Sequence, residues 1–331
     1  VLQSFTSSNA NSDPDDPLTM YGTGDTINIQ AVFNENLASG STMTVELENT
    51  ARSQVVLNQI SGSTLYGTYT VSGPHDGISD DSIDLAVRRV VSMSVSDLAT
   101  NVKSSESIPT GQNLSDNKDI IVDTVPPSLQ SFSATAGNYN AGDSITLTAH
   151  YNKSVKAGSN IHVKVNSDGG TATIDMTTVS TSTISGPYVV QSGDNVQNLK
   201  VSSIVSQAVS DIKNNQLTDT IMPSTNISDG VLVDTTAPVI TFTNDVDSGP
   251  TQSDEVTINV SEINPSSHKY IFSADNVCNT KNYTSATSFG SDTPITFIAE
   301  TNNTKYICTK SVDTAGNESY AASANPLNID I

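Results

Sequence analysis

Residues 24–34 read GDTINIQAVFN, and residues 142–152 read GDSITLTAHYN, so the second stretch repeats the pattern of the first. In both, a Gly-Asp pair precedes a run in which polar and apolar side chains alternate. Successive side chains of a strand point to opposite faces, so such a run predicts a strand with one buried face. Gly, Asp and Asn at its ends are turn-forming residues. We therefore expect half-buried antiparallel strands at 26–33 and 144–151.

These two strands belong to a repeat that runs through the chain. Matching segments keep their order in both copies: 2–5 with 129–132, 95–97 with 209–211, 113–116 with 226–229, and 122–124 with 233–235. A third, more diverged copy follows, represented by 239–242, 253–256 and 313–317. A repeat of ~100 residues has the size of one β-sandwich domain. We expect three domains, at 1–125, 126–236 and 237–331.

The composition favours strands over helices. Hydrophobic residues make up only 35% of the chain, which fits short strands with one polar face, and no long stretch shows the 3.6-residue period of an amphipathic helix. About seven strands per copy would build a sandwich of two sheets. The predicted fold class is all-β, with three tandem immunoglobulin-like antiparallel β-sandwiches.

The charge of the chain excludes two classes of partner. The formal net charge is -21, so the chain repels phosphate backbones and anionic lipid, and we expect no nucleic-acid binding and no direct membrane insertion. The acidity either keeps the chain soluble or holds divalent cations at particular sites. No apolar run is long enough to span a membrane.

Four motifs carry a resemblance to a known family. They are the Gly-Asp-x-Ile start of the second strand, Phe-Asn-Glu at 33–35, Asp-x-x-x-Asn at 97–101, 211–215 and 313–317, and Val-Asp-Thr-x-x-Pro at 122–127 and 233–238. Together they resemble bacterial Ig-like (Big-type) tandem repeats of large cell-surface adhesins, over nearly the whole chain. The resemblance implies an extracellular location at the cell surface, a structural or adhesive role as a stalk or spacer, and joints stiffened by Ca²⁺.

Residues 234–238, called joint 2/3 here, are the best candidate metal site. Strands of a sandwich alternate up and down, so the loops after the second strand and before the last one lie beside the incoming joint. This places Glu262, Asp313 and Asn317 near Asp234. Three carboxylates in one place repel one another unless a cation lies between them, and Ca²⁺ prefers such oxygen ligands. The alternative is that these side chains only shape turns through local hydrogen bonds.

Residues 123–127, called joint 1/2, depart from this pattern. Asp123 and Asp211 are present, but Lys153 occupies the position that Glu35 and Glu262 occupy in the other copies. An ammonium group there predicts an ion pair in place of a cation. Two acidic loops of the first copy should lie near this joint. Their carboxylates either supply ligands to a cation at the joint or are simply solvated: Asp13, Asp15, Asp16, Asp76, Asp80 and Asp81.

In the first copy, Glu35 and Asp97 form a weaker candidate set. The same topology places them at the end of the first sandwich that faces whatever precedes Val1. We expect a further module upstream of this segment.

The two cysteines, Cys278 and Cys308, predict one disulfide within the third copy, because an even number of cysteines is typical of secreted domains. The alternative is a pair of buried free thiols. Cys278 follows the third strand of its copy, so the predicted bridge differs from the one in antibody domains.

The motifs do not favour catalysis. None of the four histidines lies in a His-Glu-x-x-His motif, and no Gly-x-Ser-x-Gly sequence is present, so we expect no enzyme. Three functions remain open: a surface stalk, a filament subunit that donates a terminal strand to a neighbouring identical chain, and a module that binds carbohydrate or protein, such as glycans or proteins on a host surface. The low aromatic content, 5%, argues against a sugar platform built on stacking.

Overall fold

A computed structural model describes residues 1–13, 16–72, 83–167, 173–298 and 300–330. Its sheets are built almost entirely of antiparallel strands, so the all-β sandwich prediction is confirmed. Within the described residues, no helix is both long and apolar enough to cross a bilayer. We call residues 1–125, 126–236 and 237–331 modules 1, 2 and 3; their exact boundaries stay predictions.

Module 1 consists of two four-stranded sheets. One has the order β1 (Leu2–Thr6), β2 (Thr26–Phe33), β6 (Thr64–Thr70), β5 (Gln59–Ser61), and the other the order β4 (Gln54–Leu57), β3 (Thr42–Leu47), β8 (Val87–Ser96), β9 (Val102–Lys103). These orders match the two sheets of an immunoglobulin sandwich. The smaller elements are η1 (Pro17–Thr19), α1 (Leu114–Asn117) and the pair β7 (Ile83–Asp84) and β10 (Ile121–Val122).

Module 2 repeats this topology. Its sheets are β11 (Leu129–Ser133), β13 (Ser144–Tyr151), β17 (Thr183–Val189), β16 (Thr178–Ser180) and β15 (Ile174–Met176), β14 (Asn160–Val165), β18 (Val201–Ser210), β19 (Gln216–Leu217). A short parallel pair is added by β12 (Gly137–Tyr139) and β20 (Val231–Val233). The strands expected at 26–33 and 144–151 are β2 and β13, and both alternate between buried and more accessible side chains.

Module 3 has one three-stranded and one four-stranded sheet. They are β21 (Val239–Asn244), β22 (Asp254–Ser261), β25 (Pro294–Phe297) and β24 (Thr287–Ser288), β23 (Pro265–Ser273), β26 (Tyr306–Asp313), β27 (Glu318–Ala322). Two short 3-10 turns, η3 (Cys278–Thr280) and η4 (Glu300–Asn302), lie in its connections.

The sandwiches bury separate cores. Phe5 and Phe132 occupy equivalent places in the cores of modules 1 and 2, and module 3 has a core around Ile258 and Ile307. Each core is held by burial of apolar side chains from both of its sheets. A further small cluster in module 3 contains Cys278, Tyr283 and Cys308.

The repeated Asn-Leu/Ile-Ser-Asp motif has a structural explanation. The side chain of Asn113 accepts a hydrogen bond from the backbone N of Val87 and donates one to its carbonyl, at 2.9 Å each. Asn226 makes the same pair of bonds with Val201, at 3.0 and 2.8 Å. In each module the amide thus completes the backbone pairing where the long strand β8 or β18 begins.

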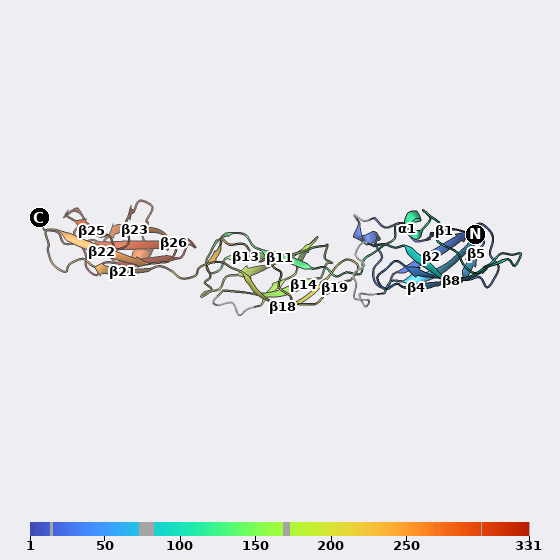
Figure 1. The fold of residues 1–331 in the computed structure, drawn as a ribbon. Coiled ribbons are helices and arrows are strands. Elements are labelled where there is room, and N and C mark those ends of the chain that lie inside the picture. Colours follow the sequence, from blue (N-terminus) through green and yellow to red (C-terminus); the bar gives the residue numbers. More distant parts are fainter. Residues whose placement is uncertain (14–15, 73–82, 168–172, 299, 331) are drawn as a thin grey trace.

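The modules follow one another in a row from the N-terminal to the C-terminal end of the molecule (Figure 1). This arrangement places the ends of neighbouring sandwiches at joints 1/2 and 2/3. The loops that carry the predicted site residues lie at these ends.

Candidate metal centre and the disulfide-clamped loop

Three carboxylates meet at joint 2/3. Asp234 directly follows β20, Glu262 directly follows β22, and Asp313 is the last residue of β26. One oxygen atom from each lies within 4.8 Å of the other two. Asp234 and Asp313 are buried, and Glu262 is half-buried. The structure therefore brings together the three carboxylates that strand alternation predicted would meet.

The Asp-x-x-x-Asn motif has the same geometry in all three modules. The backbone N of the asparagine donates to one carboxylate oxygen of the aspartate at 2.9 Å in each case. The side-chain amide donates to the other oxygen at 2.7, 2.9 and 2.7 Å in the pairs Asp97–Asn101, Asp211–Asn215 and Asp313–Asn317. The local, turn-forming interactions of the alternative interpretation are thus present.

Two of these asparagines also connect a module to the joint before it. Nδ2 of Asn317 donates to the backbone carbonyl of Asp234 at 2.8 Å, and Nδ2 of Asn215 donates to that of Asp123 at 3.1 Å. Each amide therefore links the last hairpin of one module to the joint that precedes it. Because the nitrogen of Asn317 is used in this way, only its Oδ1 is available to a cation.

Two oxygens of the cluster remain available. Asp234 accepts the Thr236 backbone N with Oδ1 at 3.0 Å, and Glu262 accepts the backbone N of Ile263 and Asn264 with Oε1 at 2.7 and 3.0 Å. No hydrogen bond between described residues uses Oδ2 of Asp234 or Oε2 of Glu262. Carboxylate oxygens are the ligands that Ca²⁺ prefers, so this donor set fits a hard divalent cation.

Asn264 was not singled out by the sequence. Its Nδ2 is buried and has no hydrogen-bond partner among the described residues. The two ends of an amide are assigned from their hydrogen bonds, so the opposite orientation would present Oδ1 at this position. No sequence pattern marks it, because it lies in the connection between β22 and β23 rather than in a repeated motif.

Joint 2/3 is open to solvent on one side. A groove of about 470 Å³ is lined by residues of modules 2 and 3, including Asp234, Val239 and Glu262. Val239 is 57% exposed and Ile263 is 84% exposed. These two apolar side chains therefore contribute little to packing between modules 2 and 3.

Joint 1/2 contains the ion pair expected from Lys153. Nζ of Lys153 lies 3.0 Å from Oδ1 of Asp123 and 3.7 Å from Oδ2 of Asp211, and it donates to the Val125 carbonyl at 2.9 Å. Asp123 and Asp211 are 4% and 1% exposed. Burial raises the pKa of the Asp123 carboxyl above its ordinary value, against the opposing effect of Lys153.

Joint 1/2 also has a direct contact between modules. Nζ of Lys213 in module 2 donates to the carbonyl of Leu18 in module 1 at 2.9 Å. Gly22 lies so close to Lys213 that a Cβ there would be 2.9 Å from the Lys213 Cβ. The insertion in module 1 thus rests against the last hairpin of module 2.

The other predicted acidic sets do not form a second three-carboxylate cluster among the described residues. Asp16 accepts the backbone N of Leu18 at 3.0 Å, as a residue shaping a local turn does. Asp15, Asp76, Asp80 and Asp81 lie outside the described residues. Glu35 and Asp97 line a common groove of about 230 Å³, where hydrogen bonds, chiefly from Asn101, lower the pKa of Asp97.

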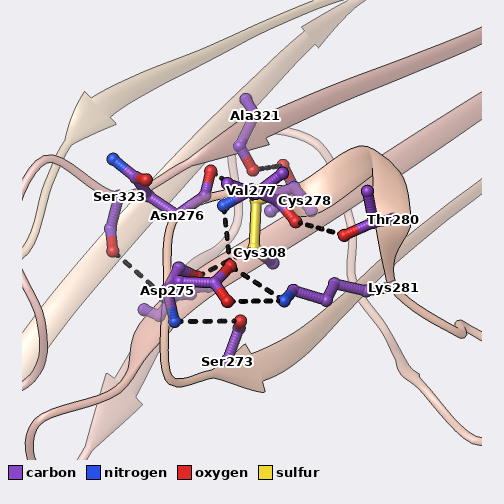
Figure 2. The surroundings of a disulfide bond; sticks show 12 residues. Ser273, Asp275, Asn276, Val277, Cys278, Thr280, Lys281, Cys308, Ala321 and Ser323 are labelled. Atoms are coloured by element: carbon purple, nitrogen blue, oxygen red, sulfur yellow. Dashed lines mark hydrogen bonds and ion pairs between the residues drawn. A yellow bond between two sulfur atoms is a disulfide. The ribbon is translucent and has the colours of Figure 1, made fainter.

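Cys278 and Cys308 form the predicted disulfide, with an S–S distance of 2.07 Å. It joins the loop after β23 to strand β26 and so holds that loop against the outer face of the sheet (Figure 2). Asp275 and Lys281 of the same loop form an ion pair at 2.8 Å. Free thiols, the alternative interpretation, do not occur in the described part of the chain.

One histidine lies beside a hydroxyl group in a way that resembles a nucleophile and its base. Nδ1 of His268 is 2.8 Å from Oγ of Ser311. Ser311 is 0% exposed, so no substrate reaches this hydroxyl group in the structure. The pair is best described as a hydrogen bond that satisfies two polar groups inside module 3.

No family model matches the chain, and no curated protein sequence matches it. Among solved structures, it is similar to a D1-D4 ectodomain fragment of ICAM-5, with 8% identity, a TM-score of 0.32, and coverage of 98% of this chain and 76% of that one. It is also similar to a putative membrane anchored protein from Corynebacterium diphtheriae, with 8% identity, a TM-score of 0.27 and coverage of 99% and 91%. The N-terminal eight Ig domains of DSCAM match with 12% identity, a TM-score of 0.19 and coverage of 94% and 39%. At these values the likeness concerns the β-sandwich fold alone.

Proposed function

We propose that this chain is a segment of an extracellular surface protein that acts as a stalk or spacer, and that Ca²⁺ stiffens its joint 2/3. The arrangement of the sandwiches in a row supports the first part of the proposal. The convergence of Asp234, Glu262 and Asp313 supports the second, and it is the observation that carries the proposal.

The physical argument for a cation is electrostatic. Each of these three carboxylates carries a negative charge when ionised, and partial burial removes much of the water that would screen their repulsion. A divalent cation bound to the free oxygens of Asp234 and Glu262 and to Asp313 would convert this repulsion into attraction. Because Asp234 precedes module 3 while Glu262 and Asp313 belong to it, the bound ion would fix the angle at the joint.

At joint 1/2, Lys153 would offset the repulsion between carboxylates without a metal. Its ammonium group lies between Asp123 of the joint and Asp211 of module 2. Direct contacts between neighbouring modules support both joints: Nζ of Lys213 donates to the Leu18 carbonyl at joint 1/2, and Nδ2 of Asn138 donates to the Thr314 carbonyl at 3.1 Å at joint 2/3. In such a stalk, joint 1/2 would keep its internal cation in any buffer, whereas joint 2/3, already crossed by hydrogen bonds from Asn317 and Asn138, would become stiffer when calcium is bound.

The filament hypothesis has less support, because both terminal segments are already paired within their own modules. β1 pairs with β2, and Ile329 forms a bridge with Thr251 while its side chain is buried. Donation of either strand to a second chain would require breaking these contacts.

Small-angle X-ray scattering with excess Ca²⁺ and with EDTA tests the proposed function. We expect an elongated monomer in both buffers, with a narrower distribution of dimensions in Ca²⁺, because only then is joint 2/3 fixed. Asp313→Asn should give the EDTA result in both buffers, whereas Asp175→Asn, at an exposed carboxylate of module 2, should behave like the unchanged protein.

The two parts of the proposal fail separately in this experiment. A compact particle, or one that grows with protein concentration, would contradict the stalk. Identical scattering in Ca²⁺ and EDTA would leave the stalk in place and remove calcium from it.

A further inference from the structure

A second groove lies on module 3 and shares no residue with the carboxylate cluster. It is formed where the connection 274–286 between β23 and β24 folds over the outer face of the four-stranded sheet. The corresponding connection in module 1, between β3 and β4, spans only 48–53. The Cys278–Cys308 disulfide fixes the longer connection against β26 (Figure 2), and the buried Tyr283 hydroxyl lies within hydrogen-bond distance of the Thr309 carbonyl of that strand.

We call this the lysine groove, because three of its lining residues are lysines in a chain with only 14 basic residues and a net charge of -21. It has a volume of about 400 Å³ and is lined by Ser267, Lys269, Lys281, Asn282, Tyr283, Thr284, Lys310 and Val312. The lysines come from three separate elements: β23, the clamped loop and β26. A concentration of ammonium groups against the overall charge favours an anionic ligand at this place.

Two of the three ammonium groups are held in position by their own counter-ions. Lys281 pairs with Asp275 at 2.8 Å, and Lys310 pairs with Glu318 at 2.6 Å. No ion pair between described residues includes Lys269. Its ammonium group, on the strand next to Lys310, is therefore the one with an uncompensated charge in the groove.

The neutral groups of the groove suggest that the ligand is larger than a simple ion. Ser267, Asn282 and Thr284 offer hydroxyl and amide groups, and Asn282 and Thr284 are exposed. The Oδ1 of Asn282 accepts bonds from Thr284 at 2.8 and 2.7 Å, which leaves its Nδ2 to donate outward. Donors and acceptors of this kind suit the hydroxyl groups of a sugar, with the lysines recognising its charge.

We propose that the lysine groove binds an acidic saccharide, that is, a sugar carrying a carboxylate or a sulfate group. Lys269 pairs with the charged group, and Ser267, Asn282 and Thr284 bind neighbouring hydroxyl groups. The clamped loop supplies one wall of the site, so the disulfide is part of the binding site as well as of the fold. Recognition of charge takes the place of aromatic stacking in a chain that contains no Trp.

Saturation-transfer NMR on the complete 331-residue segment tests this proposal. The probes are 3′-sialyllactose, 3′-sulfolactose and lactose, in low-salt buffer with EDTA so that calcium at joint 2/3 plays no part. We expect saturable binding of one or both charged probes, no binding of lactose, and at least tenfold weaker binding in Lys269→Met. The matched control is Lys305→Met, which removes a lysine of the same module that does not line the groove.

The comparison between the two charged probes identifies the acid group. Binding of 3′-sialyllactose alone assigns the site to carboxylate sugars, and binding of 3′-sulfolactose alone assigns it to sulfate esters. The proposal is overturned if neither charged probe binds, if lactose binds equally well, or if Lys269→Met binds as tightly as Lys305→Met.

Discussion

At joint 1/2 the loop after the second strand of the downstream module carries Lys153, and at joint 2/3 the corresponding loop carries Glu262. The surrounding framework is the same: a joint aspartate, an Asp-x-x-x-Asn hairpin, and an asparagine amide that donates to the carbonyl of the joint aspartate. A change from lysine to glutamate within this framework replaces a cluster of one ammonium group and two carboxylates by a cluster of three carboxylates.

The difference between the joints shows that the same fold can join neighbouring modules in two ways. Joint 1/2 is closed by an internal cation and by the contact of Lys213 with Leu18. Joint 2/3 also has a contact between modules, from Asn138 to the Thr314 carbonyl, but it has a groove of about 470 Å³ and carboxylate oxygens that no hydrogen bond between described residues uses. Under the proposed function, the first joint requires no ion from the solution, whereas the second would bind one.

The largest effect is expected from Lys153→Met. This change leaves Asp123 and Asp211 buried without their cation, and breaking a buried ion pair by removing one partner costs about 3–5 kcal/mol. The hydrogen bonds from Asn215 and from the backbone compensate only in part. Urea unfolding followed by circular dichroism measures the loss in the transition that includes modules 1 and 2.

The control for this prediction is Lys156→Met, at an exposed lysine three residues away whose ammonium group donates a hydrogen bond to the Asn214 side chain. It should change the free energy of unfolding by less than about 0.5 kcal/mol. Equal effects of the two changes would mean that Lys153 is not the internal cation of joint 1/2.

A reciprocal exchange of the two residues should exchange the behaviour of the joints. Lys153→Glu places three carboxylates at joint 1/2, so that joint should become less stable in EDTA and recover with Ca²⁺. Glu262→Lys places an ammonium group between Asp234 and Asp313, so joint 2/3 should lose its response to Ca²⁺. A ligand at 100 times its Kd stabilises the folded state by about 2.7 kcal/mol, which sets the size of the expected shift.

Calorimetry of both variants and of the unchanged protein, in Ca²⁺ and in EDTA, measures these shifts. The unchanged protein should respond to Ca²⁺ through the transition of module 3. If Glu262→Lys keeps the full response, the cation binds elsewhere and the cluster at joint 2/3 is not the site.

Much of the fold and the site could be predicted from the sequence because both depend on strand periodicity. Alternation at 26–33 and 144–151 fixed which side chains of β2 and β13 are buried. Once the strands are known to alternate up and down, the meeting of Asp234, Glu262 and Asp313 follows from the topology. The same reasoning predicted the partner of Lys153, because opposite charges were expected in one place.

Features that depend on how irregular segments fold could not be predicted. The connection 274–286 has no periodicity, so nothing in its sequence shows that it lies over the sheet and places Lys281 near Lys269 and Lys310. The contact between Lys213 and Leu18 depends on the path of an insertion that only module 1 has. The histidine–serine contact in module 3 joins residues on neighbouring strands, and its burial depends on the packing of both sheets.

The smallest expected effect is a pH dependence of the free energy of unfolding that arises from Asp123 at joint 1/2. Burial raises the pKa of Asp123 above its ordinary value of 3.8, so the folded state holds this proton more tightly than the unfolded state does. The contribution of Asp123 to stability is therefore fully present below pH 3.8 and is lost as the pH rises through the folded-state pKa. Asp123→Asn removes this contribution while Lys153 keeps Asp211 as a counter-ion.

The free energy of unfolding, measured in urea from pH 7 down to pH 3.5, should show this difference. As the pH falls, the unchanged protein should gain stability relative to Asp123→Asn, because only the unchanged protein takes up the additional proton. Asp229→Asn, at an exposed carboxylate paired with Lys200, controls for the loss of one negative charge. A gap between the unchanged protein and Asp123→Asn that widens in the opposite direction would mean that attraction to Lys153 outweighs burial, and that joint 1/2 is held mainly by its ion pair.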